Sequence, residues 1–150
     1  MADTTVTRQL LIDKLNEDLS REYQAIIAYV VYSQVLKGAQ YMNIAGELEK
    51  HAAEELRHAI TVSKHIDYLG GMPNATPRPV KLTENAEEML RADLQNENDT
   101  IRAYRERVRQ CEALGEYGIA EDIREILRQE QEHQTDLATA LGENPPDLSR

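Results

Sequence analysis

Two short motifs in the sequence pair a glutamate with a histidine three residues later, Glu55 with His58 and Glu130 with His133. On an α-helix, side chains at this spacing lie on one face about a turn apart, so each motif presents a carboxylate and an imidazole to the same space. Carboxylate oxygens and imidazole nitrogens are ligands of first-row transition metals. Each motif alone is also frequent on solvated helices, so the rest of the chain decides whether the two pairs bind metal.

Long segments without turn residues contain these motifs. The 150 residues include only 7 glycines and 5 prolines, and most of these are clustered. Long intervals between such clusters are typical of helices. The predicted helices cover residues 7–37, 39–69, 83–115 and 117–142, with Gly38, Gly70, Gly115 and Gly142 marking their ends and Thr83 as the N-cap of the third.

Each predicted helix carries an apolar stripe at heptad spacing. In the fourth, Ile119, Ile123, Ile126 and Leu137 lie on one face. A helix with such a stripe buries that face against its neighbours, so four of them predict an all-α fold, a four-helix bundle. The length predicts one domain over residues 1–150.

The connections predict the order in which the helices pack. Short links join the first helix to the second and the third to the fourth, so each pair is expected to form an antiparallel hairpin. The middle link, residues 70–82, has 13 residues. Fully extended it reaches about 43 Å, close to the roughly 45 Å length of a 30-residue helix. This long crossover between helices two and three would make those two helices parallel.

Near its middle, each stripe is interrupted by a chemically active group. Glu22 interrupts the first helix and Glu97 the third, while the two Glu-x-x-His pairs interrupt the second and fourth. Helix midpoints in a bundle share one level, so we expect all six side chains to converge there. Buried carboxylates need compensation, and two divalent cations would balance four carboxylates. This ligand set suits iron or manganese, with zinc as a substitute. The alternative is that some of these groups lie on solvated faces.

The composition narrows the function classes. The formal net charge of −10 disfavours binding to nucleic acid. The longest apolar run, residues 25–32, is far shorter than the roughly 20 residues that cross a bilayer, so no membrane segment is expected. The N-terminal stretch MADTTVTRQLL lacks a secretion signal, and the single cysteine forms no internal disulfide. A cytoplasmic location is the expectation.

The residues around the six groups resemble the ferritin-like superfamily, and most of all bacterioferritin. The resemblance implies a ferroxidase that oxidises Fe(II) with O2 or peroxide for iron storage or detoxification, in a homo-oligomer. It implies Glu22, Glu55 and His58 around one iron, Glu97, Glu130 and His133 around the other, Glu55 and Glu130 as bridges, and Tyr29 beside the centre as an electron donor. The matching stretches are LNEDLSREYQAIIAYVVYS (15–33), EELRHA (54–59), EEMLRADLQNEND (87–99) and REILRQEQEH (124–133).

The sequence departs from bacterioferritin at three places. Bacterioferritin ligates haem through a methionine directly after the glutamate of helix two, and Leu56 stands there, so no haem is predicted. Lys50 occupies a position where some members carry an iron-binding histidine on the inner surface. The stretch GENPPDLSR follows helix four in place of the family's short fifth helix, which leaves the subunit number open.

Two other functions remain open. One is a rubrerythrin-like peroxidase, although Leu94 stands where that family has an additional glutamate. The other is a non-enzymatic helical scaffold with a structural metal or none. Among further residues, we expect His51 and His65 to be partly solvated or to support the ligands. Asp93 is expected to orient a ligand histidine or to lie on the surface. We expect Tyr104 and Cys111 to fill the core, and residues 102–110 to form a solvated face or a subunit contact.

Overall fold

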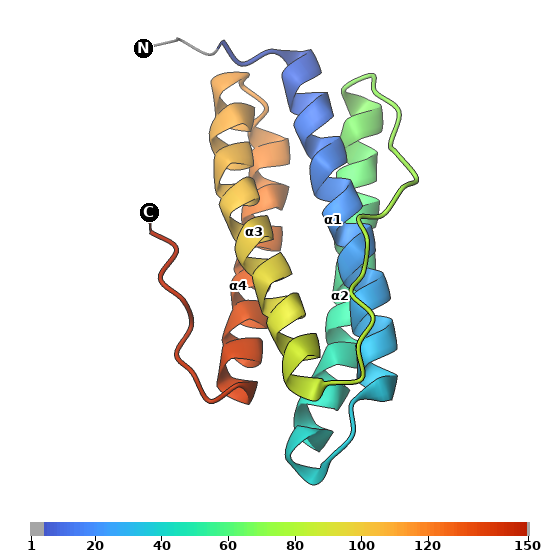
Figure 1. Cartoon of the computed structure of the whole chain (residues 1–150). Coiled ribbons are helices and arrows are strands. Elements are labelled where there is room, and N and C mark those ends of the chain that lie inside the picture. Colours follow the sequence, from blue (N-terminus) through green and yellow to red (C-terminus); the bar gives the residue numbers. More distant parts are fainter. Residues whose placement is uncertain (1–4, 150) are drawn as a thin grey trace.

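A computed structural model describes residues 5–149 of the chain, which form an antiparallel pair of helical hairpins (Figure 1). The predicted all-α four-helix bundle is confirmed. Residues 1–4, on which the expectation of no secretion signal partly rests, and Arg150 lie outside the described residues. The helices are α1 (Arg8–Val35), α2 (Met42–Tyr68), α3 (Ala86–Ala113) and α4 (Tyr117–Ala140), with a short 3-10 helix, η1 (Ala39–Tyr41), before α2.

The helix ends follow local capping chemistry, with one correction. Thr7 caps α1, because its hydroxyl accepts a hydrogen bond from the backbone N–H of Leu10 at 3.0 Å. The prediction that Thr83 caps the third helix is wrong: α3 begins two residues later, and Asn85 accepts from the N–H of Glu88 at 2.9 Å. The Thr83 hydroxyl instead accepts from the N–H of Asn85, which fixes the turn before the helix.

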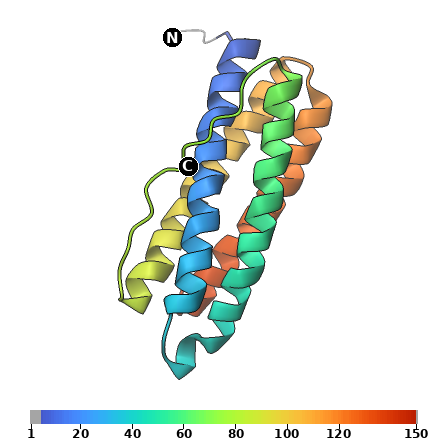
Figure 2. The ribbon, with the colours of Figure 1, turned by 90° about the vertical axis from the view of Figure 1, so that its right-hand side faces the viewer.

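The long link between α2 and α3 runs down the outside of α1, as Figures 1 and 2 show. Tyr23 donates to the carbonyl of Asn74 at 3.1 Å, and Gln24 donates to that of Pro79 at 2.9 Å. The link also approaches α1 closely where it begins, since a Cβ on Gly71 would lie 2.6 Å from a methyl carbon of Ile12. Because this segment spans the bundle, α3 starts at the same end as α2 and runs parallel to it, as the sequence predicts.

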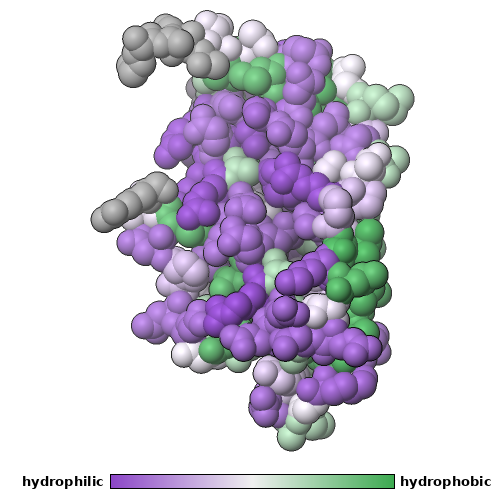
Figure 3. All heavy atoms as spheres, viewed as in Figure 1, coloured by the Kyte–Doolittle hydropathy of each residue, from purple (hydrophilic) through white to green (hydrophobic). Residues whose placement is uncertain are grey.

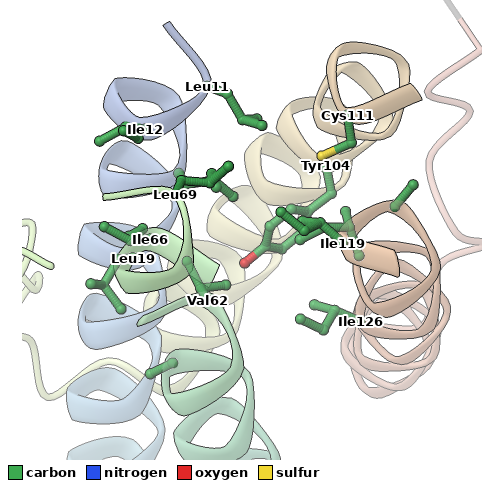
Figure 4. Packing of buried hydrophobic residues seen from close by; sticks show 14 residues of the cluster. Leu11, Ile12, Leu19, Val62, Ile66, Leu69, Tyr104, Cys111, Ile119 and Ile126 are labelled. Carbon is green, nitrogen blue, oxygen red and sulfur yellow. The ribbon is translucent and has the colours of Figure 1, made fainter. Parts of the chain in front are cut away.

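The core consists of two apolar clusters, one toward each end of the bundle. Figure 4 shows the first, in which apolar side chains of all four helices pack in one cluster that includes Tyr104. The second cluster includes Tyr29, Leu48, Leu90 and Leu137. Buried charged and polar side chains lie between the two clusters. The apolar ends therefore hold the helices in register around a polar middle layer.

A buried ion pair links α1 to α3. Arg107 donates to both carboxylate oxygens of Asp18, at 2.6 and 2.9 Å, and Arg21 pairs with the same carboxylate. All three side chains are buried. The prediction of a solvated face or subunit contact for residues 102–110 is therefore wrong at Arg107, because the carboxylate of Asp18 supplies the partner that a buried guanidinium requires.

In residues 5–149, none of the helices has the length and hydropathy needed to cross a membrane.

Candidate metal centre

The middle layer brings together all six side chains that the sequence analysis selected. α1 supplies Glu22, α2 supplies Glu55 and His58, α3 supplies Glu97, and α4 supplies Glu130 and His133. Each is at most 2 % exposed. The midpoints of the four helices therefore meet at one level.

The six side chains form two clusters that share two members. Each cluster contains three carboxylates and one imidazole whose potential ligand atoms lie within 4.8 Å of one another. Glu55 and Glu130 belong to both clusters, so each is placed to contact two ions at once. The first cluster is completed by Glu22 and His58, the second by Glu97 and His133.

The two histidines point the same ring nitrogen, Nδ1, into the centre. Nδ1 of His58 lies 3.1 Å from a carboxylate oxygen of Glu130 and 3.5 Å from one of Glu22. Nδ1 of His133 lies 2.9 Å from Glu55 and 3.7 Å from Glu97. The ring centroids of the two histidines are 6.3 Å apart.

Many atoms of this centre that could bind a metal ion have no hydrogen-bond partner. Buried polar groups are almost always hydrogen-bonded, so a group of unpartnered atoms at one place needs an explanation. Their number and chemistry fit metal binding, since each is a carboxylate oxygen or an imidazole nitrogen facing the same space. The unpartnered atoms are one oxygen each of Glu22 and Glu97, both oxygens of Glu55 and Glu130, and Nδ1 of His58 and His133.

The electrostatics of the centre favour the binding of cations. Burial and neighbouring carboxylates raise the pKa of Glu55 and of Glu130 well above the ordinary value. Burial disfavours a charged histidine, but the facing carboxylates outweigh it: they raise the pKa of His58, and Glu97 above all raises that of His133 to about 10. Without metal, the cluster therefore retains protons that a divalent cation would displace.

The outward nitrogens of the ligand histidines have partners that the sequence analysis missed. Nε2 of His58 contacts the amide oxygen of Gln129 at 2.5 Å, and Nε2 of His133 contacts the carboxylate of Glu54 at 3.0 Å. Acceptors at this position fix the orientation and tautomer of a metal-binding imidazole. Asp93, one candidate for this role, is buried without such a contact, and burial followed by the charge of Glu97 raises its pKa well above the ordinary value.

Two tyrosines donate hydrogen bonds to the two glutamates that each belong to only one cluster. Tyr29 donates to Glu97 at 3.0 Å, and Tyr104 donates to Glu22 at 2.7 Å. Burial, followed by nearby carboxylates, raises the pKa of both phenols well above 10, so both stay protonated and remain donors. Tyr104 thus does more than fill the core, the role expected from its place on the apolar stripe.

The centre has an internal two-fold pattern that appears once the contacts are known. Each ligand of the centre in α1 and α2, and each residue there that contacts a ligand, has a counterpart 75 positions later in α3 and α4. The hydrogen bonds repeat the same relation: Tyr29 holds Glu97 while Tyr104 holds Glu22. Once one of the two outer contacts is known, this offset leads from Glu54 to Gln129 in the sequence. It relates the pairs 22/97, 29/104, 54/129, 55/130 and 58/133.

The remaining candidates lie outside the two clusters. His51 and His65 are buried, and each contacts an aspartate through Nε2, Asp136 at 3.1 Å and Asp122 at 2.8 Å. Cys111 is buried in the first apolar cluster, and burial raises the pKa of its thiol to about 11, which suits a structural role.

With this geometry established, comparison with known proteins shows the family. Residues 12–144 match the Ferritin family, described as a ferritin-like domain. The chain belongs to the ferritin-like family, and within it resembles bacterioferritin. It is 31 % identical over 140 residues to the bacterioferritin of Brucella melitensis, covering 89 % of this chain and 87 % of that protein.

Solved structures of related proteins have the same fold. One, of ferritin-like, diiron-carboxylate proteins from Bacillus anthracis, has a TM-score of 0.87 and 30 % identity, covering 92 % of this chain and 99 % of that one. Another is a dodecameric thioferritin, the bacterioferritin-related protein of Bacteroides fragilis, with a TM-score of 0.84 and 28 % identity over 91 % of this chain and 87 % of that one.

Proposed function

We propose that the protein is a di-iron ferroxidase, which takes two Fe(II) ions into the centre and passes one electron from each to O2 or peroxide. The observation that carries this proposal is the pair of overlapping clusters, with three carboxylates and one imidazole in each and two glutamates in common. The bacterioferritin relatives and the diiron-carboxylate structure support it at the level of the family.

The residues of the chain would perform distinct tasks in this reaction. Glu55 and Glu130 would bridge the two ions, and the remaining ligands would complete each site. Four carboxylates balance the charge of two divalent ions, and iron supplies the redox chemistry. The apolar clusters on both sides exclude water from the centre. Manganese and zinc would fit the same ligands as substitutes.

The test compares Fe(II) oxidation in air, followed by the absorbance of the Fe(III) product, in the wild type and in Glu130→Ala. Loss of a side chain shared by both clusters is expected to reduce the rate to that of iron alone. Glu132→Ala is the matched control, because Glu132 lies on the same helix with an exposed side chain and should leave the rate unchanged. Equal background rates in the wild type and both variants would contradict the proposal.

Replacing O2 by peroxide under anaerobic conditions identifies the oxidant. Faster oxidation of Fe(II) with peroxide than with O2 would favour a peroxidase-type reaction. Metal analysis of protein expressed with added iron separates an enzyme from a scaffold, since two ions per chain are expected at this centre and a content far below one would favour a scaffold.

We also propose that the subunits assemble through the outer face of α1 and α2. Large apolar side chains are exposed there: Val30 is 51 %, Leu56 53 % and Ile60 63 % exposed. Gln34, one turn after Val30 on α1, donates to Glu49 of α2, so the two helices adjoin at this exposed face. Figure 3 shows the main gathering of hydrophobic side chains along the right-hand edge of the view, on the side of α1 and the link, with smaller hydrophobic areas elsewhere. Contiguous exposed apolar surface marks protein contacts.

A further inference from the structure

A third group of potential metal ligands lies between α2 and α4, beside the di-metal centre. It consists of Glu47, His51 and Asp136, whose ligand atoms all lie within 4.8 Å of one another. Nε2 of His51 is 3.1 Å from a carboxylate oxygen of Asp136. None of the three residues belongs to the two clusters of the di-metal centre.

The histidine of this group is held rigidly. His51 is 2 % exposed, and its ring stacks on that of His133 with centroids 4.0 Å apart. The ring of Tyr29 contacts it edge-on, with centroids 5.1 Å apart. Packing on two sides fixes the direction of Nε2, which is the preorganisation that a metal ligand needs.

The two carboxylates of the group are open to solvent. Asp136 has 41 % of its side chain exposed and lines two adjoining surface depressions, one of which it shares with Glu47. Glu47 also pairs with Lys50 at 3.1 Å, but the lysine side chain is 72 % exposed, and such surface pairs contribute little to stability. An ion could therefore arrive from solvent and displace the lysine from the carboxylate.

The fold itself does not require a histidine at this place. The residue 75 positions after His51 is Ile126, which is buried in an apolar cluster at the equivalent position of the other hairpin. The counterpart of Asp136 is Thr61. The counterpart of Glu47 is Asp122, also a carboxylate, but the other two equivalent positions hold no histidine and no carboxylate. The complete ligand group therefore occurs in only one half of the pattern, so His51 and Asp136 are not a packing requirement of the bundle.

We propose that Glu47, His51 and Asp136 form a third site, which binds a divalent first-row transition-metal ion next to the His133 side of the di-metal centre. Two carboxylates match the charge of one divalent ion, and the mixed oxygen and nitrogen donors suit iron, cobalt or zinc. Three ligands leave coordination positions open to water, so the ion is exchangeable. The site stands on its own ligands and does not depend on the proposed ferroxidase reaction.

Co(II) titration of the metal-free protein, followed by calorimetry, tests the proposal. The wild type is expected to bind three ions per chain and Asp136→Asn two. Asp122→Asn is the matched control: it removes the same kind of aspartate from a buried histidine, His65, for which residues 5–149 supply no third ligand, and three ions should still bind. Glu47→Gln changes a second ligand whose side chain is 43 % exposed, and this variant too is expected to bind two ions.

A crystal soaked in Co(II) locates the ions by anomalous scattering. A peak between the three side chains in the wild type, absent in Asp136→Asn and present in Asp122→Asn, is the expected result. Two filled positions in the di-metal centre without this peak would overturn the third site and leave the proposed function intact. Empty positions in the di-metal centre would count against the proposed function, and the peak beside His51 would still decide the third site by itself.

Discussion

The shared glutamates of the di-metal centre lead to a quantitative prediction about stability. Glu130 belongs to both clusters, whereas Glu22 belongs to one. Both are buried, and leucine has a similar size, so Glu130→Leu and Glu22→Leu each replace one carboxylate without opening a large cavity. If the assignment of ligands is right, the first variant loses both metal ions and the second loses one.

The size of the effect follows from linkage. An ion that binds only the folded state, at a free concentration of about 100 times its Kd, stabilises that state by about 2.7 kcal/mol. Two ions therefore contribute about 5 kcal/mol, and at about 2–4 °C per kcal/mol for a chain of this size the melting temperature should rise by roughly 10–20 °C. With Asp136→Asn introduced into every chain, so that the proposed third site does not contribute, we expect about half of this rise in Glu22→Leu and almost none in Glu130→Leu.

Thermal unfolding followed by circular dichroism, with and without Zn(II), measures these shifts without redox chemistry. Each variant is compared with its own metal-free form, so the hydrogen bond that Tyr104 loses in Glu22→Leu cancels. Metal-free Glu130→Leu should be at least as stable as the metal-free wild type, because both oxygens of Glu130 lack partners. Equal Zn(II)-induced shifts in the two variants would refute the assignment of bridging and terminal ligands.

Three further changes test other parts of the structure. Tyr29→Phe removes the donor to Glu97, and because a hydrogen bond to a charged group contributes about 1.5 kcal/mol or more, calorimetry should show about tenfold weaker binding of one ion; unchanged affinity would contradict this role. Arg107→Leu leaves the Asp18 carboxylate with only Arg21 and should lower the free energy of unfolding in urea by about 3–5 kcal/mol, whereas a loss below about 1 kcal/mol would show that the pair is dispensable. Leu56→Glu places a charge on the apolar outer face and should reduce the particle mass in analytical ultracentrifugation, and an unchanged mass would exclude this face as the subunit contact.

The sequence was sufficient to predict the bundle and the six residues that meet in it, because helix periodicity and helix midpoints locate a side chain in three dimensions. Residues next to the ligands were harder. Glu54 and Gln129 each directly precede a ligand glutamate, and neighbouring residues on a helix point about 100° apart, so periodicity places them off the core stripe. Only the packed histidines show that they reach Nε2.

Charged residues with distant partners were beyond sequence reasoning for a different reason. Arg107 lies in a run of arginines that is typical of a solvated face, and nothing near it in the sequence indicates Asp18, which lies 89 positions earlier. The cap at Asn85 was missed because two good capping residues stand close together, and the turn formed by Thr83 decides between them.

The separation of the core into two apolar clusters affects how the bundle would open. Helices in isolation fray from their ends, but here both ends are closed by packed side chains, and the unpartnered donor atoms lie in between. We therefore expect local opening of the metal-free chain to begin in this middle layer, at the level of Glu55 and Glu130. Metal ions bound by side chains of all four helices would stabilise this middle layer. The same local opening would allow ions to enter the centre.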